Sequence, residues 1–152
     1  MEEGCFFEDL YPGRVLRSAR ALAMNSERIV TFAQEFDPHP AHVSPEAAKE
    51  TMFGRLCASG WHTAATTNRL IFETLRVPGG GAGAGVEQLR WLRPVYPDDI
   101  LRVEIEVLSA RRSRSRPNAG VVTYRCTTLN QENAPVQEFT SIILVPRRGT
   151  VG

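Results

Sequence analysis

Regular alternation of hydrophobic and polar residues marks the second half of the chain as β-structure. Between Leu101 and Val107 every second residue is aliphatic and the residues between them are charged, which is typical of a strand with one buried face. Other stretches are similarly rich in β-branched residues, and the predicted antiparallel strands cover 86–93, 100–112, 120–129 and 136–145. The polar run between the last two strands, 130–133, predicts a hairpin turn.

Helical spacing of hydrophobic residues dominates the first half. Residues 15–23 follow a turn signal and predict one initial strand. Asn25 and Ser26 then offer an N-cap for a short amphipathic helix over 27–36. The longest helix is expected over 59–76, where apolar residues share one side.

Two prolines interrupt the helical pattern between these two helices. Pro38 and Pro40 each lack an N–H donor and bias the preceding residue away from the helical region. We therefore expect Asp37 and His42 on a stiff loop. A brief further helix is predicted to start at Ser44, which can serve as its N-cap.

The order of the elements predicts an α+β fold. One strand, short helices, a long helix and four antiparallel strands suggest a curved sheet around a central helix. The length fits one domain, residues 1–152. The glycine-rich stretch 78–85 is expected to be a flexible connection between helix and sheet.

Composition narrows the class of protein without naming a ligand. The formal net charge is +1, which gives no general attraction to nucleic acid or to anionic membrane surfaces. No apolar stretch approaches the roughly 20 residues of a membrane span, and the acidic N-terminus lacks the basic and apolar run of a secretory signal. Cys5, Cys57 and Cys126 form no C-x-x-C pair. We therefore expect a reduced, cytoplasmic protein that binds neither nucleic acid nor membrane.

Asp37 and His42 are the residues best suited to catalysis. They stand five positions apart, and a carboxylate beside an imidazole orients the ring and favours its charged form. Such a pair is suited to moving a proton to or from a water molecule. The spacing alone leaves an alternative, in which Asp37 caps a turn and His42 is an ordinary loop residue.

Several sequence blocks resemble one known family. FDPHPAH resembles the D-x-N-P-x-H signature of MaoC-like dehydratases and (R)-specific enoyl-CoA hydratases, with the same spacing from acid to histidine. Three later blocks are similar to other motifs of that family, in the same order: FGRLCASGWHTAATTNRL, LRWLRPVYPDDILRVEIEVL and RSRSRPNAGVVTY. The similarity extends from Phe7 to about Pro146. It implies a hot-dog fold and a hydro-lyase that acts on an enoyl or 3-hydroxyacyl thioester.

The resemblance also implies roles for individual residues. Asp37 and His42 would hold one water, which His42 deprotonates as it attacks the β-carbon. Gly60, at the start of the longest helix, would offer a backbone N–H to the enolate oxygen. Ser59 is expected to be an N-cap, and Ser59 and Trp61 are candidates for substrate contact.

Two positions depart from the family pattern. His39 stands where the signature usually has Asn, so we expect it to border the substrate and to alter the hydrogen bonds of the loop. Asp98 stands where glycine is more usual, and it is expected to affect a turn rather than the chemistry.

A basic cluster lies between the second and third predicted strands. It contains Arg111, Arg112, Arg114 and Arg116. Aromatic residues do not interleave with it, which argues against nucleic-acid binding, and a solvated hairpin tip is the simplest interpretation. In the context of the resemblance, Arg114 and Arg116 are candidates for contact with the phosphates of coenzyme A or of a carrier-protein arm.

Other chemistries fit the sequence less well. Asp37, His39, His42 and His62 are conceivable metal ligands, but the prolines are expected to prevent a helix that places His39 and His42 on one face. No metal or redox cofactor is therefore expected. Hot-dog thioesterases commonly use an acid on the central helix, and the acid available in this helix, Glu73, stands near its far end.

The resemblance implies an assembly as well. A single hot-dog unit leaves an edge strand unpaired, so we expect a homodimer or a dimer of dimers with pockets at the junction. Trp61 and Trp91 are expected in the core or the interface, although either can shorten an acyl pocket. A non-catalytic subunit that binds acyl thioesters is the alternative from a different functional class.

Overall fold

A curved antiparallel sheet and one long helix make up most of the structure, a computed structural model that describes residues 4–149. The helices are α1 (Ser26–Phe36), α2 (Pro40–Val43), α3 (Pro45–Ala48) and α4 (Gly60–Leu75), with 3-10 turns at Phe7–Asp9 and Pro78–Gly80. The strands are β1 (Val15–Arg17), β2 (Leu22–Met24), β3 (Ala82–Trp91), β4 (Asp99–Arg112), β5 (Ala119–Leu129) and β6 (Pro135–Pro146). The predicted α+β class is confirmed.

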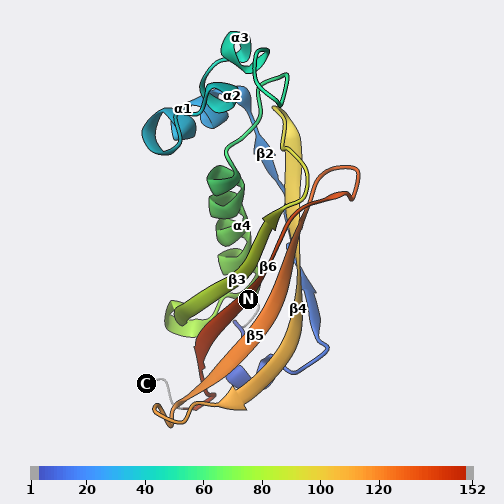
Figure 1. Ribbon diagram of the computed structural model, residues 1–152. Coiled ribbons are helices and arrows are strands. Elements are labelled where there is room, and N and C mark those ends of the chain that lie inside the picture. Colours follow the sequence, from blue (N-terminus) through green and yellow to red (C-terminus); the bar gives the residue numbers. More distant parts are fainter. Residues whose placement is uncertain (1–3, 150–152) are drawn as a thin grey trace.

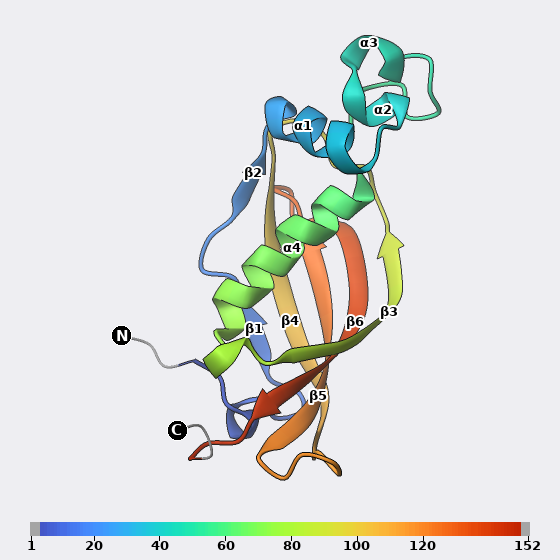
Figure 2. The same ribbon diagram turned by 90° about the vertical axis from the view of Figure 1, so that its left-hand side faces the viewer.

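The strands follow the order β1-β4-β5-β6-β3, and β2 also pairs with β4. All of these pairings are antiparallel. Helix α4 lies across one face of the sheet, and α1, α2 and α3 gather beyond its N-terminal end (Figures 1 and 2). This arrangement brings the short helices and the start of α4 to one end of the molecule.

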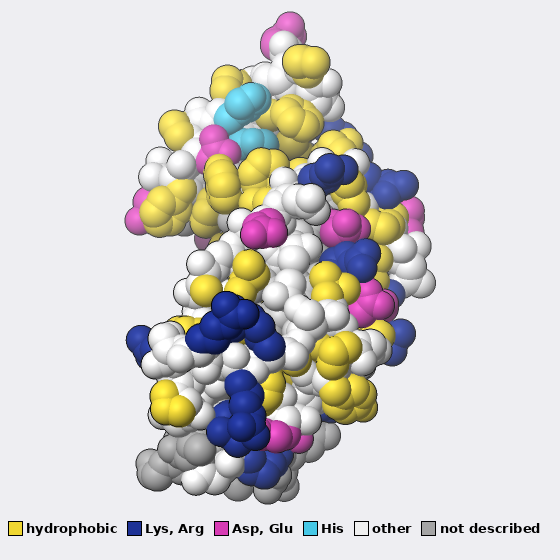
Figure 3. Space-filling view, turned by 60° about the horizontal axis from the view of Figure 1, so that its bottom comes forward, with side chains coloured by type: hydrophobic (Ala, Val, Ile, Leu, Met, Phe, Trp, Pro, Cys, Tyr) yellow, Lys and Arg dark blue, Asp and Glu magenta, His cyan; other side chains and the backbone are white. Residues whose placement is uncertain are grey.

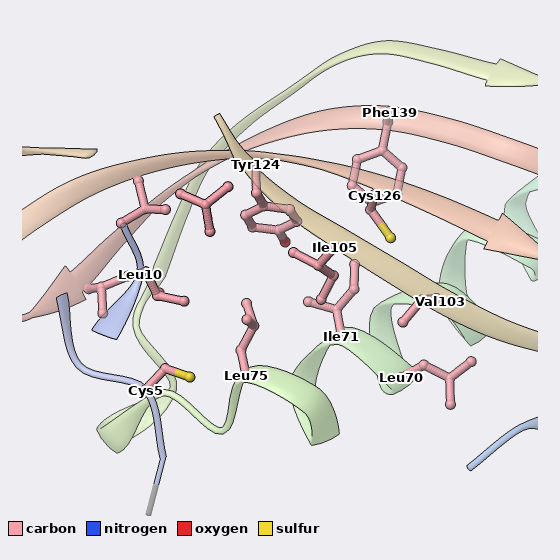
Figure 4. Packing of buried hydrophobic residues seen from close by; sticks show 13 residues of the cluster. Cys5, Leu10, Leu70, Ile71, Leu75, Val103, Ile105, Tyr124, Cys126 and Phe139 are labelled. Atoms are coloured by element: carbon pink, nitrogen blue, oxygen red, sulfur yellow. The ribbon is translucent and has the colours of Figure 1, made fainter. Parts of the chain in front are cut away.

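The alternation along β4 produces the core as predicted. Its aliphatic residues from Leu101 to Val107 are at most 1% exposed, while the charged residues between them are half-buried. In Figure 4, side chains of α4 lie opposite side chains of the sheet. The labelled residues of this cluster include Leu70, Ile71 and Leu75 on α4 and Val103, Ile105, Tyr124, Cys126 and Phe139 on the strands. Burial of this apolar area holds the helix to the sheet.

A second apolar cluster fixes the short helices. It joins Ile29 of α1, Ala41 of α2 and Ala48 of α3 to Val95 and to Leu101 of β4. The two alanines are fully buried, so the short helices approach one another closely. Segments that are too short to be stable in water are thereby held by tertiary packing.

The prediction of one continuous first strand over 15–23 is wrong. The chain forms β1 and β2, each three residues long, with a bend between them. The Ser18 N–H donates to the Val103 carbonyl, and the Ser18 hydroxyl accepts from the Val103 N–H. Because this side chain satisfies a backbone donor of β4, the ladder continues across the bend without a regular strand.

The glycine-rich stretch 78–85 is a connection only as far as residue 81. Gly79, Gly80 and Gly81 all have positive φ and turn the chain, a conformation that glycine adopts without a steric penalty. Residues from Ala82 onward belong to β3 and pair with β6, with a register shift between Gly83 and Gly85. The prediction failed because strand pairing uses the backbone, which glycine supplies as well as any residue.

Within residues 4–149, no helix is long and apolar enough to cross a membrane.

Two leucines of β4 offer a test of the core. Leu101 is fully buried, whereas Leu108 is 38% exposed beside a register shift. We expect Leu101→Ala to lower the free energy of unfolding by about 2–5 kcal/mol and Leu108→Ala by about 0.5 kcal/mol, as measured by urea denaturation. Equal losses in the two variants would contradict the assignment of the buried face.

Candidate functional site

Three residues of the predicted site lie where α1 ends and α2 begins. Asp37 is the C-cap residue of α1, and His39 is the N-cap residue of α2. His42 lies within α2, not on a loop as predicted, because Pro40 occupies the first helical position, where a missing N–H carries no penalty. The expectation that prolines keep His39 and His42 off one face is also wrong, since their ring centroids are 4.9 Å apart.

A backbone carbonyl fixes the orientation of the His42 ring. His42 Nδ1 lies 2.7 Å from the carbonyl oxygen of Cys57, and a carbonyl only accepts, so Nδ1 carries the proton. In neutral His42 the lone pair is then on Nε2, which lies 3.7 Å from Asp37 Oδ2. His42 is 7% exposed, so the surrounding residues hold the ring in one orientation, with Nε2 toward Asp37.

Ser59 connects Asp37 to the start of α4. The Ser59 hydroxyl donates to Asp37 Oδ2 over 2.7 Å and accepts from the Trp61 N–H over 3.2 Å. The predicted N-cap is therefore confirmed. Because Ser59 is fully buried, the bond also fixes the carboxylate relative to the helix.

Asp37 and His42 line a cavity of about 370 Å³. The opposite parts of its wall include Gly60 and Trp61 of α4, Trp91 at the end of β3, and residues 92–95. The lining is mostly apolar, with a few polar groups close together, as is usual for small-molecule sites. Figure 3 shows histidine side chains beside an acidic group and hydrophobic residues at this end of the molecule.

Gly60 brings the N-terminus of α4 to the cavity. No hydrogen bond from its N–H to another described residue is present, as expected for the first residue of a helix. A Cβ at this position would lie 2.3 Å from the indole ring of Trp91. The glycine therefore leaves a donor available and lets the indole pack against the helix backbone.

His39 borders the cavity from its exposed side. Its Nδ1 accepts from the Ala41 N–H over 3.0 Å, which stabilises the start of α2. The Phe53 ring packs near both His39 and His42, with centroids 6.0 and 6.1 Å away. Trp61 and Trp91 line the cavity as well and contact each other edge to face.

Several contributors to the cavity were not predicted, among them Cys57, Phe53 and Arg93. The carbonyl of Cys57 holds His42, and Phe53 and Arg93 form part of the lining. A backbone carbonyl leaves no signal in a sequence. Phe53 and Arg93 stand in the blocks that resemble the family, so the resemblance contained a signal for them that was not used.

Arg114 and Arg116 are not part of the cavity in this chain. They are exposed on the turn between β4 and β5, at the end of the sheet away from α1–α3 (Figure 1). Basic side chains also gather in the lower half of the face in Figure 3, away from the histidines. Their contact with a coenzyme or carrier arm therefore remains a prediction.

His62 does not line the cavity of Asp37 and His42. It stacks on Phe32 of α1 with a centroid distance of 4.6 Å, and burial, together with nearby Arg28, lowers its pKa. Among residues 4–149, no group of three or more histidine, cysteine or acidic side chains is arranged to hold a metal ion.

Glu73 forms ion pairs with two arginines. Its carboxylate accepts from Arg20 Nε over 2.8 Å and from Arg69 Nε over 2.9 Å. These hydrogen bonds lower its pKa to about 2. The acid of α4 is thus a partner in surface ion pairs, which argues against its use in thioester hydrolysis.

The MaoC like domain family matches residues 9–130 of the chain. The chain belongs to this family. As a MaoC-like protein it is 33% identical over 136 residues to an uncharacterized protein of Bacillus subtilis, covering 89% of this chain and 94% of the relative.

Two further relatives have named activities. A mesaconyl-CoA hydratase of Cereibacter sphaeroides is 30% identical, and the match covers 97% of this chain but 43% of that longer protein. An (R)-specific enoyl-CoA hydratase of Rhodospirillum rubrum is 27% identical, with 95% of this chain and 94% of the relative covered.

Solved structures share the fold. A MaoC-like dehydratase from Rhodospirillum rubrum is 45% identical with a TM-score of 0.89, covering 95% of this chain and 99% of the other. The unliganded R-hydratase PhaJ1 of Pseudomonas aeruginosa is 25% identical with a TM-score of 0.77, covering 95% and 88%. The MaoC-like chain therefore has the hot-dog fold that its sequence blocks implied.

The contact between Gly60 and Trp91 is testable by a double-mutant cycle. We expect Gly60→Ala to lower the free energy of unfolding by about 1–3 kcal/mol, because the added methyl overlaps the indole. In a Trp91→Ala background the same substitution should cost much less. Urea denaturation of the four proteins measures both costs, and equal costs would show that the indole does not occupy this space.

Proposed function

We propose that this MaoC-like protein is a hydro-lyase that adds water to an enoyl thioester or removes it from a 3-hydroxyacyl thioester. The observation that carries the proposal is the approach of Asp37 Oδ2 to within 3.7 Å of His42 Nε2, in a cavity that also contains Gly60. Two relatives named as hydratases support the reaction class. The site residues and the substrate class are part of the proposal.

The geometry suits one shared water molecule. Two acceptors 3.7 Å apart can both reach a water at ordinary hydrogen-bond distances. In the hydration direction His42 Nε2 takes a proton from this water while its oxygen forms a bond to the β-carbon of the substrate. The pair of electrons displaced from the double bond moves to the thioester oxygen. The carbonyl then re-forms as the α-carbon takes up the proton held by His42 Nε2.

Gly60 supplies the group that stabilises the charge of the enolate. Its N–H is the first of the unsatisfied donors of α4, and the positive end of the helix dipole lies there. A fixed donor of this kind stabilises an oxyanion without reorganisation during the reaction. Ser59 is a positioning residue, because its hydroxyl orients the Asp37 carboxylate.

The proposed reaction requires no metal or redox group. Each step moves a proton or an electron pair among the substrate, the water and His42, and coenzyme A or a carrier protein enters as part of the substrate. Cys5, Cys57 and Cys126 are buried and unpaired, and on this basis we also propose that the protein works in the reducing cytoplasm.

We further propose that the protein is a homodimer joined along β3. This strand forms one edge of the sheet, and all of its residues except Leu89 are exposed. An exposed edge is able to pair with another chain. The exposed aromatic residues Trp61, Phe72 and Trp91 lie on α4 and β3 beside this edge, and aromatic residues are enriched in protein interfaces.

Substitution of the acid and the base tests the reaction. Asp37→Asn and His42→Gln should each reduce kcat/KM for hydration of an enoyl-CoA about 10²- to 10⁴-fold without loss of the folded state. His62→Gln is the matched control, because His62 does not line the cavity, and its activity should equal that of the parent protein. Absorbance of the enoyl thioester measures the rate, and circular dichroism verifies the fold.

Two outcomes would contradict the hydro-lyase. Full activity in Asp37→Asn or His42→Gln would remove these residues from the mechanism. Binding of enoyl thioesters with no turnover by the parent protein would instead favour the non-catalytic subunit.

A matched pair of phenylalanines tests the proposed dimer. Phe72 on α4 is 63% exposed and Phe36 on α1 is 64% exposed. We expect Phe72→Glu to shift the protein toward monomer, because it places a charge in the interface, and Phe36→Glu to leave the dimer intact. Light scattering after size-exclusion chromatography measures the mass, and a monomeric parent protein would disprove the assembly.

A further inference from the structure

We propose that Trp61 and Trp91 form a wall, the indole wall, that limits the acyl group to short chains of about four or five carbons. The inference rests on the proposed function and assigns the substrate class to the same site. Trp61 lines both the catalytic cavity and a second cavity. The wall therefore separates two spaces that would otherwise adjoin.

The second cavity is suited to an acyl chain but lies beyond the wall. Its volume is about 450 Å³, and it lies between α4 and the sheet. Its lining includes Ala64, Ile71, Leu89, Tyr124 and Phe139. A longer chain that started at Gly60 would need this apolar space, and the side chain of Trp61 stands in between.

Buried polar groups fix the position of Trp91. Its indole Nε1 donates to Gln137 Oε1 over 2.9 Å. Gln137 is fully buried and in turn donates from Nε2 to Thr67 Oγ1 over 3.1 Å, and Thr67 shares a hydrogen bond with Thr128. A network in which every member has a partner holds the ring in one orientation.

Packing completes the wall. One face of the Trp91 ring rests against Gly60, and Trp61 meets the ring edge to face with a centroid distance of 5.0 Å and an interplanar angle of 85°. A thioester whose oxygen is bound at the Gly60 N–H therefore meets indole within a few carbons. The carrier end of the substrate would leave on the opposite side, where His39 and Phe53 border the cavity and are exposed.

Chain-length profiles test the indole wall. In the parent protein kcat/KM should fall roughly tenfold or more between the four-carbon and the eight-carbon 2-enoyl-CoA. Trp61→Ala should raise the ratio of eight-carbon to four-carbon activity by a similar factor, because it joins the two cavities. Tyr11→Ala removes an aromatic ring of nearly equal exposure, 58% against 56%, outside both cavities, and should leave the profile unchanged.

A second variant distinguishes the removal of the indole wall from a general loss of activity. Ala64→Phe in the Trp61→Ala background should refill the second cavity and restore the preference for four carbons. Light scattering reports whether each variant keeps the oligomeric state of the parent. An unchanged profile in Trp61→Ala, or activity reduced equally at every chain length, would overturn the wall.

Binding of saturated acyl-CoA esters distinguishes failure of the wall from failure of the reaction. Calorimetry should show that the parent binds butyryl-CoA about tenfold more tightly than octanoyl-CoA. If the parent hydrates no enoyl-CoA but keeps this difference, the hydro-lyase is wrong and the wall stands. If it hydrates four-carbon and eight-carbon substrates equally, the wall is wrong and the hydro-lyase stands.

Discussion

The hydroxyl of Ser59 joins the architecture to the candidate site. It caps the helix around which the sheet curves, and the same oxygen donates to the Asp37 carboxylate. The packing of α4 against the sheet therefore sets where the carboxylate stands. A cap is worth about 1 kcal/mol to a helix, yet here it also determines the relation between an acid on α1 and a backbone donor on α4. Its full burial excludes water from competing for either bond.

Much of the fold follows from local patterns in the sequence. The alternation from Leu101 to Val107 gave the buried face of β4, and the proline-free apolar spacing over 59–76 gave α4 to within a residue at each end. The errors lie where tertiary contacts override local pattern. Ser18 replaces a strand pairing with a side-chain hydrogen bond to β4, beside the bend between β1 and β2. Glycines near residue 83 join the sheet through their backbone alone.

The sequence indicated which residues belong to the candidate site, but it indicated less about how they are arranged. The spacing of Asp37 and His42, together with the resemblance, singled out an acid and an imidazole that the structure places 3.7 Å apart. The carbonyl of Cys57, which selects the tautomer of His42, could not be predicted from the sequence, because any residue at position 57 has the same backbone carbonyl. Asp98 shows the reverse case: it was expected to affect a turn, and it adopts a φ of 71°, a left-handed conformation that glycine adopts most readily.

The contact between the Trp91 indole and Gly60 constrains which substitutions can change the substrate range of such a site. The Trp91 indole, one of the two rings of the proposed wall, touches the backbone that would receive the thioester oxygen. Enlarging the pocket at this position would therefore disturb the amino end of the helix, and selectivity and turnover would change together. Substitution of Trp61 would enlarge the pocket with less disturbance, because it is the Trp91 indole that packs against Gly60. We therefore expect relatives with broader substrate ranges to differ at Trp61 rather than at Trp91.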